Sequence, residues 1–305
     1  MTNLTIKIGQ TVFKNPVFVA SGTFGYGTEI NDLTDISALG AIITKSITLH
    51  PREGNPPPRT IETLGGMINS IGLANMGVDN YIRDMLPLYH QFPTKIIVNI
   101  AGSTMEEYLQ VLKKFESVSS NITGYEINIS CPNVKEGGMA FGVNADFTAR
   151  LTEQLRSLTQ RLLIVKLSPN VTDITQIGKA AQRAGADAVS AINTLVGMSI
   201  DSTTRKSNIY TTYGGLSGPA IKPVALACVH KLFLKLKIPV IGIGGITNVS
   251  DAIEFALAGA VAFQVGTANF RDPDIGRKIV YELDDYCTQN NLKYSDLKGQ
   301  VIRYQ

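Results

Sequence analysis

Cysteine and histidine are scarce in this chain, which narrows the chemistry that the protein can carry. The 305 residues include three cysteines, at positions 131, 228 and 287, and three histidines. The cysteines are odd in number and scattered, and neither residue type shows metal-ligand spacing, so we expect neither a disulfide framework nor a metal site. Unpaired cysteines are typical of a reducing compartment. We therefore predict a cytoplasmic protein.

An excess of charge of one sign and long apolar runs are also lacking. The net charge is +3 with 17% charged residues, and no basic block appears, which argues against a nucleic-acid partner. No apolar run approaches the roughly 18 residues of a membrane span, and the first residues lack the pattern of a secretion signal. Because 44% of the residues are hydrophobic, we expect a soluble globular protein with a large core and no membrane partner.

Short apolar segments alternate with helical patterns along the chain. Eight segments rich in Val and Ile read as buried strands: residues 16–21, 41–46, 96–100, 124–130, 163–167, 188–192, 239–243 and 261–265. Helical patterns lie at residues 105–117, 146–159, 174–184, 219–236 and 249–258. This order predicts an α/β protein with parallel strands and right-handed crossovers. Eight evenly spaced strands favour a (β/α)8 TIM barrel over a doubly wound open sheet, as one domain over residues 1–305.

Three segments interrupt this alternation. Residues 5–8 and 11–13 predict an N-terminal β-hairpin that caps one end of the barrel. Residues 47–75 and 194–218 are long insertions after the second and the sixth strand. Long loops in compact domains are usually functional or disordered. Because both follow the carboxyl ends of strands, where barrel enzymes place their active sites, we expect them to border a site.

The strand at residues 124–130 ends in the most informative segment, Asn128-Ile129-Ser130-Cys131-Pro132-Asn133. Proline removes a backbone donor, so the chain must leave the sheet here. A thiol exchanges protons near neutral pH when its surroundings favour thiolate, although free cysteine is more often simply buried. No carboxylate pair of the glycosidase type competes with it. Cys131 is therefore the best candidate for an acid, a base or a nucleophile.

Lysine and asparagine side chains gather at the predicted strand ends. Lys45 and Lys166 lie inside or beside apolar strands, where an unpaired charge is costly. Either could merely extend its ammonium to solvent, but two at equivalent strand ends favour a functional role. Asn99, Asn128 and Asn193 could satisfy loop backbone or present donors and acceptors to an amide-bearing ligand.

Glycine loops follow the last two predicted strands, at Gly244-Gly245 and at Gly266-Thr267. Barrel enzymes frequently bind phosphate with these two loops and a helix N-terminus. Glycine lets backbone amides approach the phosphate closely. The sequence therefore predicts a phosphate site, although the spacing is not that of the dinucleotide fingerprint.

These segments together resemble the dihydroorotate dehydrogenase family. The matching runs cover essentially the whole chain in order: Ala20 to Gly27, Asn69 to Asn75, Asn128 to Asn133, Gly244-Gly245 and Gly266-Thr267. The resemblance implies FMN as cofactor and the oxidation of (S)-dihydroorotate to orotate in de novo pyrimidine (UMP) biosynthesis. The chain resembles the class 1 enzymes in two features: it has cysteine at the base position, and it lacks an N-terminal extension. The run from Cys131 to Gly138 resembles class 1B, whose catalytic subunit passes electrons to NAD through an FAD/2Fe-2S partner subunit, as a homodimer within a heterotetramer.

The resemblance also implies roles, position by position. Cys131 would act as the base toward C5 while hydride passes from C6 to FMN N5, and Lys166 would stabilise charge near N1. The loop at Gly137-Gly138 would close over the substrate. The flavin would be held by Ser21, Lys45, Ser46, Asn99, Asn128, Lys166, Ile192, Gly218, Gly244, Gly245, Gly266 and Thr267. Dihydroorotate would be held by Lys45, Asn69, Ser70, Ile71, Gly72, Leu73, Asn128, Asn193 and Thr194.

Three alternatives stay open at this point. A class 1A-type homodimer would use fumarate as electron acceptor. A non-redox barrel enzyme acting on a phosphosugar would use the phosphate loops with a Schiff-base lysine. A flavin-binding electron-transfer or assembly subunit would lack chemistry of its own.

Overall fold

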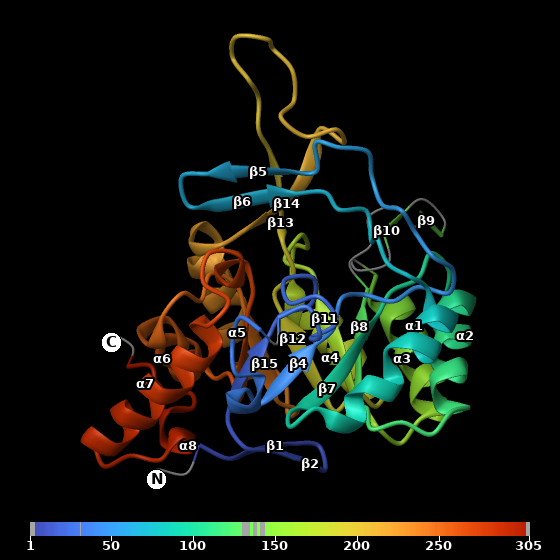
Figure 1. Ribbon diagram of the computed structural model, residues 1–305. Helices are drawn as coiled ribbons and strands as arrows, with labels where there is room; N and C mark the ends of the chain where they lie inside the picture. Colours follow the sequence, from blue (N-terminus) through green and yellow to red (C-terminus); the bar gives the residue numbers. More distant parts are fainter. Residues whose placement is uncertain (1–3, 31, 130–134, 137–138, 141–143, 303–305) are drawn as a thin grey trace.

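Eight parallel strands close into a barrel at the centre of the molecule (Figure 1). The computed structural model describes residues 4–302 except 31, 130–134, 137–138 and 141–143. The strands neighbour one another in the order β11-β12-β15-β16-β3-β4-β7-β8. They are β3 (Val17–Val19), β4 (Ala41–Ile43), β7 (Lys95–Ile100), β8 (Gly124–Asn128), β11 (Leu162–Leu167), β12 (Ala188–Ala191), β15 (Val240–Ile243) and β16 (Ala262–Val265). The predicted TIM barrel is confirmed, and each of the eight predicted segments supplies one strand.

Several strands end earlier than predicted, and this matters for the site. β3 ends at Val19 and β4 at Ile43. The chain leaves the ladder here, because the Lys45 N–H donates to the carbonyl of Gly25 at 2.9 Å instead of to a neighbouring strand. Residues just past these ends can therefore face a ligand rather than pack in the sheet.

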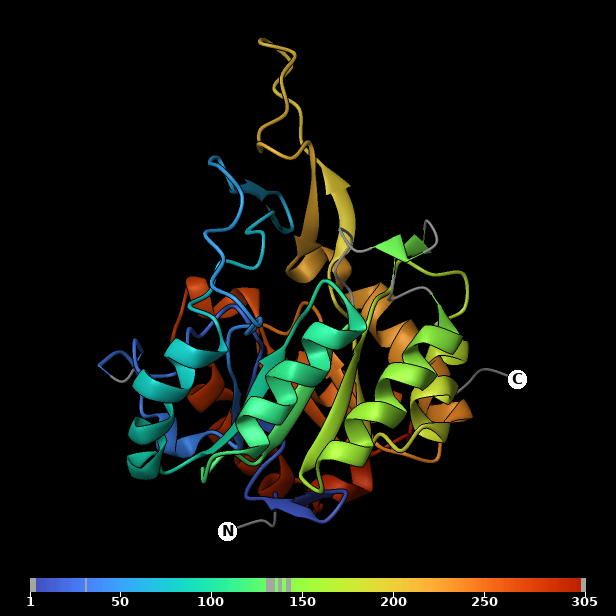
Figure 2. The ribbon, with the colours of Figure 1, turned by 90° about the vertical axis from the view of Figure 1, so that its right-hand side faces the viewer.

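Helices surround the barrel (Figures 1 and 2). The α-helices are α1 (Val78–Asp84), α2 (Met105–Glu116), α3 (Ala145–Leu158), α4 (Ile174–Arg183), α5 (Lys222–Lys235), α6 (Val249–Ala258), α7 (Ile275–Gln289) and α8 (Tyr294–Leu297). Short 3-10 turns are η1 (Ile36–Ala38), η2 (Leu86–Gln91), η4 (Pro219–Ile221) and η5 (Thr267–Phe270). The five predicted helices are present, the one expected over 219–236 beginning as η4. Side chains at the N-caps of α2, α3, α4 and α6 satisfy the first amides, as Thr104 does for α2.

The N-terminal hairpin lies at the opposite end of the barrel from the insertions (Figure 1). β1 (Ile6–Ile8) and β2 (Thr11–Phe13) pair antiparallel, with Ile6 opposite Phe13. Ile6, Ile8 and Phe13 are buried, so the hairpin covers apolar surface at that end. This prediction is confirmed.

The two long insertions form one sheet at the carboxyl end of the barrel (Figures 1 and 2). Its strands are β5 (Thr60–Thr63) and β6 (Gly66–Asn69) from the first insertion and β13 (Leu195–Met198) and β14 (Tyr213–Ser217) from the second. Gly215 lies opposite Asn69, and Ser217 opposite Met67. The insertions are therefore ordered against each other, a pairing that the sequence did not predict. A further short ribbon joins β9 (Lys135–Glu136) and β10 (Met139–Ala140).

Candidate active site

A cavity of about 370 Å³ lies where the barrel strands end. Its volume is that of a pocket for a cofactor or small molecule, and the insertion sheet forms one of its walls through Met67, Asn69 and Ser217. Sixteen residues that the sequence placed in the site line this one cavity: Ser21, Lys45, Ser46, Asn69, Ile71, Leu73, Asn128, Lys166, Ile192, Asn193, Thr194, Gly218, Gly244, Gly245, Gly266 and Thr267.

Three predicted residues lie behind the cavity wall rather than in it. Asn99 is fully buried and accepts a hydrogen bond from Ser46 Oγ at 2.6 Å. Ser70 Oγ accepts from Asn55 Nδ2 and from Thr211 Oγ1, each at 2.7 Å. A side chain at Gly72 would collide with Asn55. Through its hydrogen bond, Asn99 holds Ser46, which does line the cavity. Cys131, the predicted base, and Gly137-Gly138 lie outside the described residues.

Lys166 is buried at the floor of the cavity, on β11. Its side chain is 7% exposed, and its Nζ lies 3.6 Å from Oε1 of Glu126, which has no exposed surface. A lysine that extended its ammonium to solvent would be far more accessible, so that interpretation is wrong for Lys166. The sequence did not lead us to predict a role for Glu126. The signal was nevertheless the one that had singled out Lys166, namely a charged residue between apolar residues of a strand.

Lys45 differs from Lys166 in its electrostatic surroundings. It follows β4, is half-buried and lines the cavity. Among the described residues, no carboxylate lies within ion-pair distance of its Nζ. An ammonium in a cavity without a protein counter-ion is suited to bind an anionic group of a ligand.

Two asparagine amides meet across the cavity floor. Asn193, just after β12, donates from Nδ2 to Oδ1 of Asn128 at the end of β8, at 3.2 Å. Its own Oδ1 accepts from the Thr194 N–H at 2.8 Å. Tyr108 on α2 donates from its hydroxyl to the backbone carbonyl of Asn128 at 2.7 Å. The end of β8 is thus held from two sides, by a side chain and by the adjacent helix.

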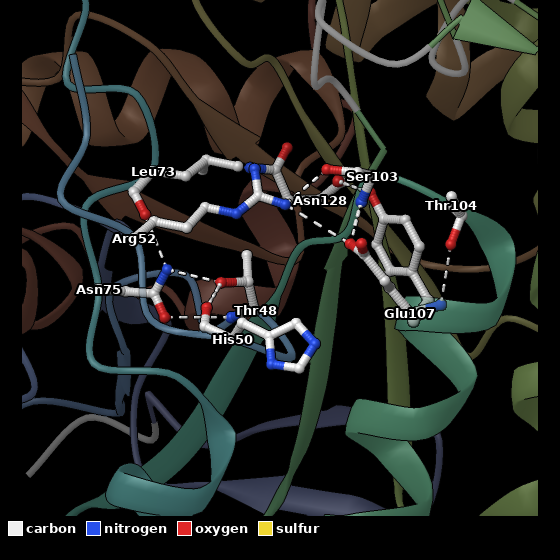
Figure 3. A network of polar contacts seen from close by, with 10 residues as sticks. Thr48, His50, Arg52, Leu73, Asn75, Ser103, Thr104, Glu107 and Asn128 are labelled. Atoms are coloured by element: carbon white, nitrogen blue, oxygen red, sulfur yellow. Dashed lines mark hydrogen bonds and ion pairs between the residues drawn. The ribbon is translucent and has the colours of Figure 1, made fainter.

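The loop that carries Leu73 is fastened to the N-terminus of α2 (Figure 3). Arg52 and Asn75 exchange two backbone hydrogen bonds of 2.9 Å, and the Asn75 amide donates to the Leu73 carbonyl at 2.7 Å. From the other side, Arg52 Nη2 donates to Ser103 Oγ at 2.5 Å and lies 3.5 Å from Glu107 Oε2. Arg52 therefore joins the first insertion to the barrel wall.

A glycine turn follows β15 and lines the cavity. Gly245 has φ +76°, and a side chain there would come within 2.9 Å of the Gly218 carbonyl, so glycine is required. Asp251 on α6 accepts from the Thr247 N–H at 2.8 Å, from Thr247 Oγ1 at 2.7 Å and from Lys222 Nζ at 2.6 Å. Burial would raise the pKa of Asp251, but the hydrogen bonds from Lys222 and Thr247 lower it below its ordinary value. An ionised Asp251 therefore anchors the turn.

Comparison with known proteins decides the family. Residues 3–286 match the family model described as dihydroorotate dehydrogenase. The chain belongs to the dihydroorotate dehydrogenase family. It is 50% identical to "Dihydroorotate dehydrogenase B (NAD(+)), catalytic subunit" of Parabacteroides distasonis over 96% of both chains, and 50% identical to the protein of the same name from Desulforamulus reducens over 95% of both chains.

A solved dihydroorotate dehydrogenase shares the fold. The structure of DHODH from Eimeria tenella in complex with ferulenol superposes with a TM-score of 0.80 and covers 98% of this chain and 88% of that chain. At 23% identity this similarity shows the barrel fold alone.

The dihydroorotate dehydrogenase cavity of this chain also has walls that the sequence did not predict. They include Thr60, Met67, Ser217, Ile221 and Phe270. Thr60, Met67 and Ser217 belong to the insertion sheet, so only its long-range pairing brings them to the cavity. Neither their residue type nor their place in the sequence offers a signal for this.

Proposed function

We propose that this chain oxidises (S)-dihydroorotate to orotate in de novo pyrimidine biosynthesis, as the FMN-containing catalytic subunit of an NAD-linked enzyme. The observation that carries the proposal is the composition of the cavity described above. It presents several amides, glycine turns and the ammonium of Lys45, which has no carboxylate within ion-pair distance in the part of the chain that the structure describes. A planar, anionic, amide-bearing substrate and a phosphate-bearing cofactor match these groups.

The described residues fit FMN. The backbone at Gly266 is open to the cavity, since a side chain there would meet only the Ala20 side chain, at 3.5 Å. The Gly245 turn, anchored by Asp251, would hold the phosphate together with Gly218, Gly244 and Thr267. The buried ammonium of Lys166 would lie beside the flavin ring, with Ser21, Ser46, Asn128 and Ile192 completing the contacts and Asn99 holding Ser46 from behind. When bound, FMN supplies a hydride acceptor at N5.

The remaining residues would hold the substrate. Lys45 would pair with the carboxylate of dihydroorotate, a charge-assisted contact. The amides of Asn69, Asn128 and Asn193, with Thr194, Ile71 and Leu73, would orient the ring. Cys131, which follows β8 closely, would remove the C5 proton as C6 loses hydride.

A partner subunit would carry the electrons onward to NAD. Support comes from the relatives, which are named catalytic subunits of an NAD(+) enzyme. The chain has three cysteines in all, too few for the four ligands of an iron–sulfur cluster. We therefore propose that an FAD/2Fe-2S subunit joins a homodimer of this chain in a heterotetramer. Within the described residues no helix is long and apolar enough to span a membrane.

The proposal is tested by orotate formation. The purified chain, supplied with dihydroorotate and an artificial dye as electron acceptor, should form orotate, and NAD+ should replace the dye only when the partner subunit is co-purified. Fumarate-dependent turnover by the chain alone would favour the class 1A-type alternative. A colourless protein that forms no orotate would overturn the proposal and favour the phosphosugar alternative.

A further inference from the structure

Polar side chains from five strands form a layer inside the barrel, below the cavity. Asn99 on β7 lies opposite Glu126 on β8 in the strand register, and Lys166 on β11 lies opposite Ser190 on β12. Gln264 on β16 completes the layer from the other side. Buried barrel interiors are usually filled by branched apolar residues, so a layer of this kind requires an explanation.

Glu126 is the centre of this layer. Its Oε1 accepts from Asn99 Nδ2 at 2.7 Å and faces Lys166 Nζ at 3.6 Å. Its Oε2 accepts from Gln264 Nε2 at 2.6 Å and from Ser190 Oγ at 2.8 Å. Both carboxylate oxygens are therefore saturated with donors, and the residue has no exposed surface.

Glu126 is a fully buried carboxylate that accepts hydrogen bonds at both oxygens and faces the ammonium of Lys166. A fully buried carboxylate is costly unless it is paired and hydrogen-bonded. Lys166 is its partner, and in the described part of the chain Glu126 is the one carboxylate within ion-pair distance of Lys166. Lysine carries its charge on a flexible four-carbon stem, so a fixed counter-charge determines where the ammonium rests.

We propose that Glu126 is a positioning residue for the flavin: its carboxylate holds Lys166 at the cavity floor and offsets part of the ammonium charge. This rests on the proposed function, since it concerns the flavin that the cavity would hold. Charges interact strongly where the effective dielectric constant is low. The Glu126 charge therefore limits how far Lys166 favours the reduced, negatively charged flavin over the oxidised form.

Glu126→Gln removes this charge, and its neighbours can still form hydrogen bonds with the side chain at position 126 if two of these bonds reverse direction. Gln264 Oε1 is buried and has no hydrogen-bond partner among the described residues. Its amide can therefore turn over and accept from a glutamine amide at position 126, while the Ser190 hydroxyl rotates to accept as well. The remaining oxygen still accepts from Asn99. We expect this variant to fold.

The first measurement is the two-electron midpoint potential of the bound flavin. Glu126→Gln should raise the potential by a shift that corresponds to at least a tenfold change in the equilibrium between oxidised and reduced flavin, about 30 mV. The matched control is Glu116→Gln: Glu116 accepts from Tyr125 and Thr159 away from the cavity, and its substitution should leave the potential unchanged. An unchanged or lowered potential in Glu126→Gln would overturn the proposal, because a purely structural Glu126 would alter stability alone.

A second measurement does not depend on flavin. Lys166→Met leaves the Glu126 carboxylate buried without its cation, which is strongly destabilising. The double variant Lys166→Met/Glu126→Gln should therefore have a higher urea midpoint than Lys166→Met alone. If the losses of unfolding free energy of the two single variants simply add in the double variant, the two charges are not coupled. If the wild-type chain binds no flavin, the proposed function fails. If it binds flavin but both measurements give the contrary result, only the role of Glu126 fails.

Discussion

The side chain of Asn193 donates a hydrogen bond to Asn128 Oδ1 at 3.2 Å and thereby joins the loop after β12 to the end of β8. The carbonyl of Asn128 is held in turn by the Tyr108 hydroxyl. Asn128 is thus fixed through both its side chain and its backbone. The predicted base, Cys131, follows shortly after this anchored residue in the sequence.

Replacing Cys131 by alanine should abolish turnover near neutral pH while FMN stays bound. A positioned general base contributes typically about 10²–10⁴-fold to the rate, and none of the predicted flavin contacts involves this thiol. Turnover and flavin content of the purified variant measure the two effects. Cys228→Ala is the matched control, because Cys228 lies on α5 away from the cavity and should be dispensable. Near-normal turnover of Cys131→Ala would refute its role as base.

Replacing Lys45 by alanine should weaken substrate binding. A hydrogen bond to a charged group contributes about 1.5–3 kcal/mol, so we expect KM for dihydroorotate to rise by roughly tenfold to a hundredfold. Steady-state kinetics at varied substrate concentration measure this effect. Lys179→Ala, an exposed lysine on α4, should leave KM unchanged. An unaltered KM in Lys45→Ala would show that the substrate carboxylate binds elsewhere.

Replacing Arg52 by alanine should loosen the first insertion without disturbing the barrel. The variant loses the contacts to Ser103 and Glu107, so Leu73 is positioned less well over the substrate. We expect KM to rise about tenfold, since a charge-assisted hydrogen bond is lost, with flavin affinity unchanged. Arg83→Ala removes an exposed ion pair with Asp84 and should change neither quantity. Equal losses of flavin and substrate affinity in Arg52→Ala would instead indicate general unfolding of the site.

Asp251 should make stability depend on pH in a defined window. Its pKa lies below the ordinary value because of the hydrogen bonds that Lys222 and Thr247 donate, which outweigh burial. Its contribution to stability is therefore full above the unfolded value of about 3.9 and is lost as the pH falls through the lower folded value. The difference in unfolding free energy between wild type and Asp251→Asn should be constant from neutral pH down to about pH 5 and shrink below about pH 4. A difference that instead grew with acidification would contradict this role.

The sequence predicted the barrel because its strands are mostly apolar and its helices recur at an even spacing. Lys45, Lys166 and the glycine turns were found by the same logic, since charged or flexible residues at strand ends are costly without a function. Their convergence on one cavity follows from the parallel arrangement of the strands.

The insertion sheet and Glu126 could not be found in this way. The pairing of Asn69 with Gly215 joins segments far apart in the sequence, and no local pattern predicts such contacts. For Glu126 the residue type was visible, but its significance depends on four donors from four other strands. A buried charge is interpretable only once its partners are known.

The most direct measurement is anaerobic mixing of the purified chain with dihydroorotate while the flavin absorbance is followed. The proposed function predicts a yellow protein whose visible absorbance bleaches on addition of dihydroorotate, with one orotate formed per flavin. A chain that carries flavin but is not bleached by dihydroorotate, or that contains no flavin, would contradict it.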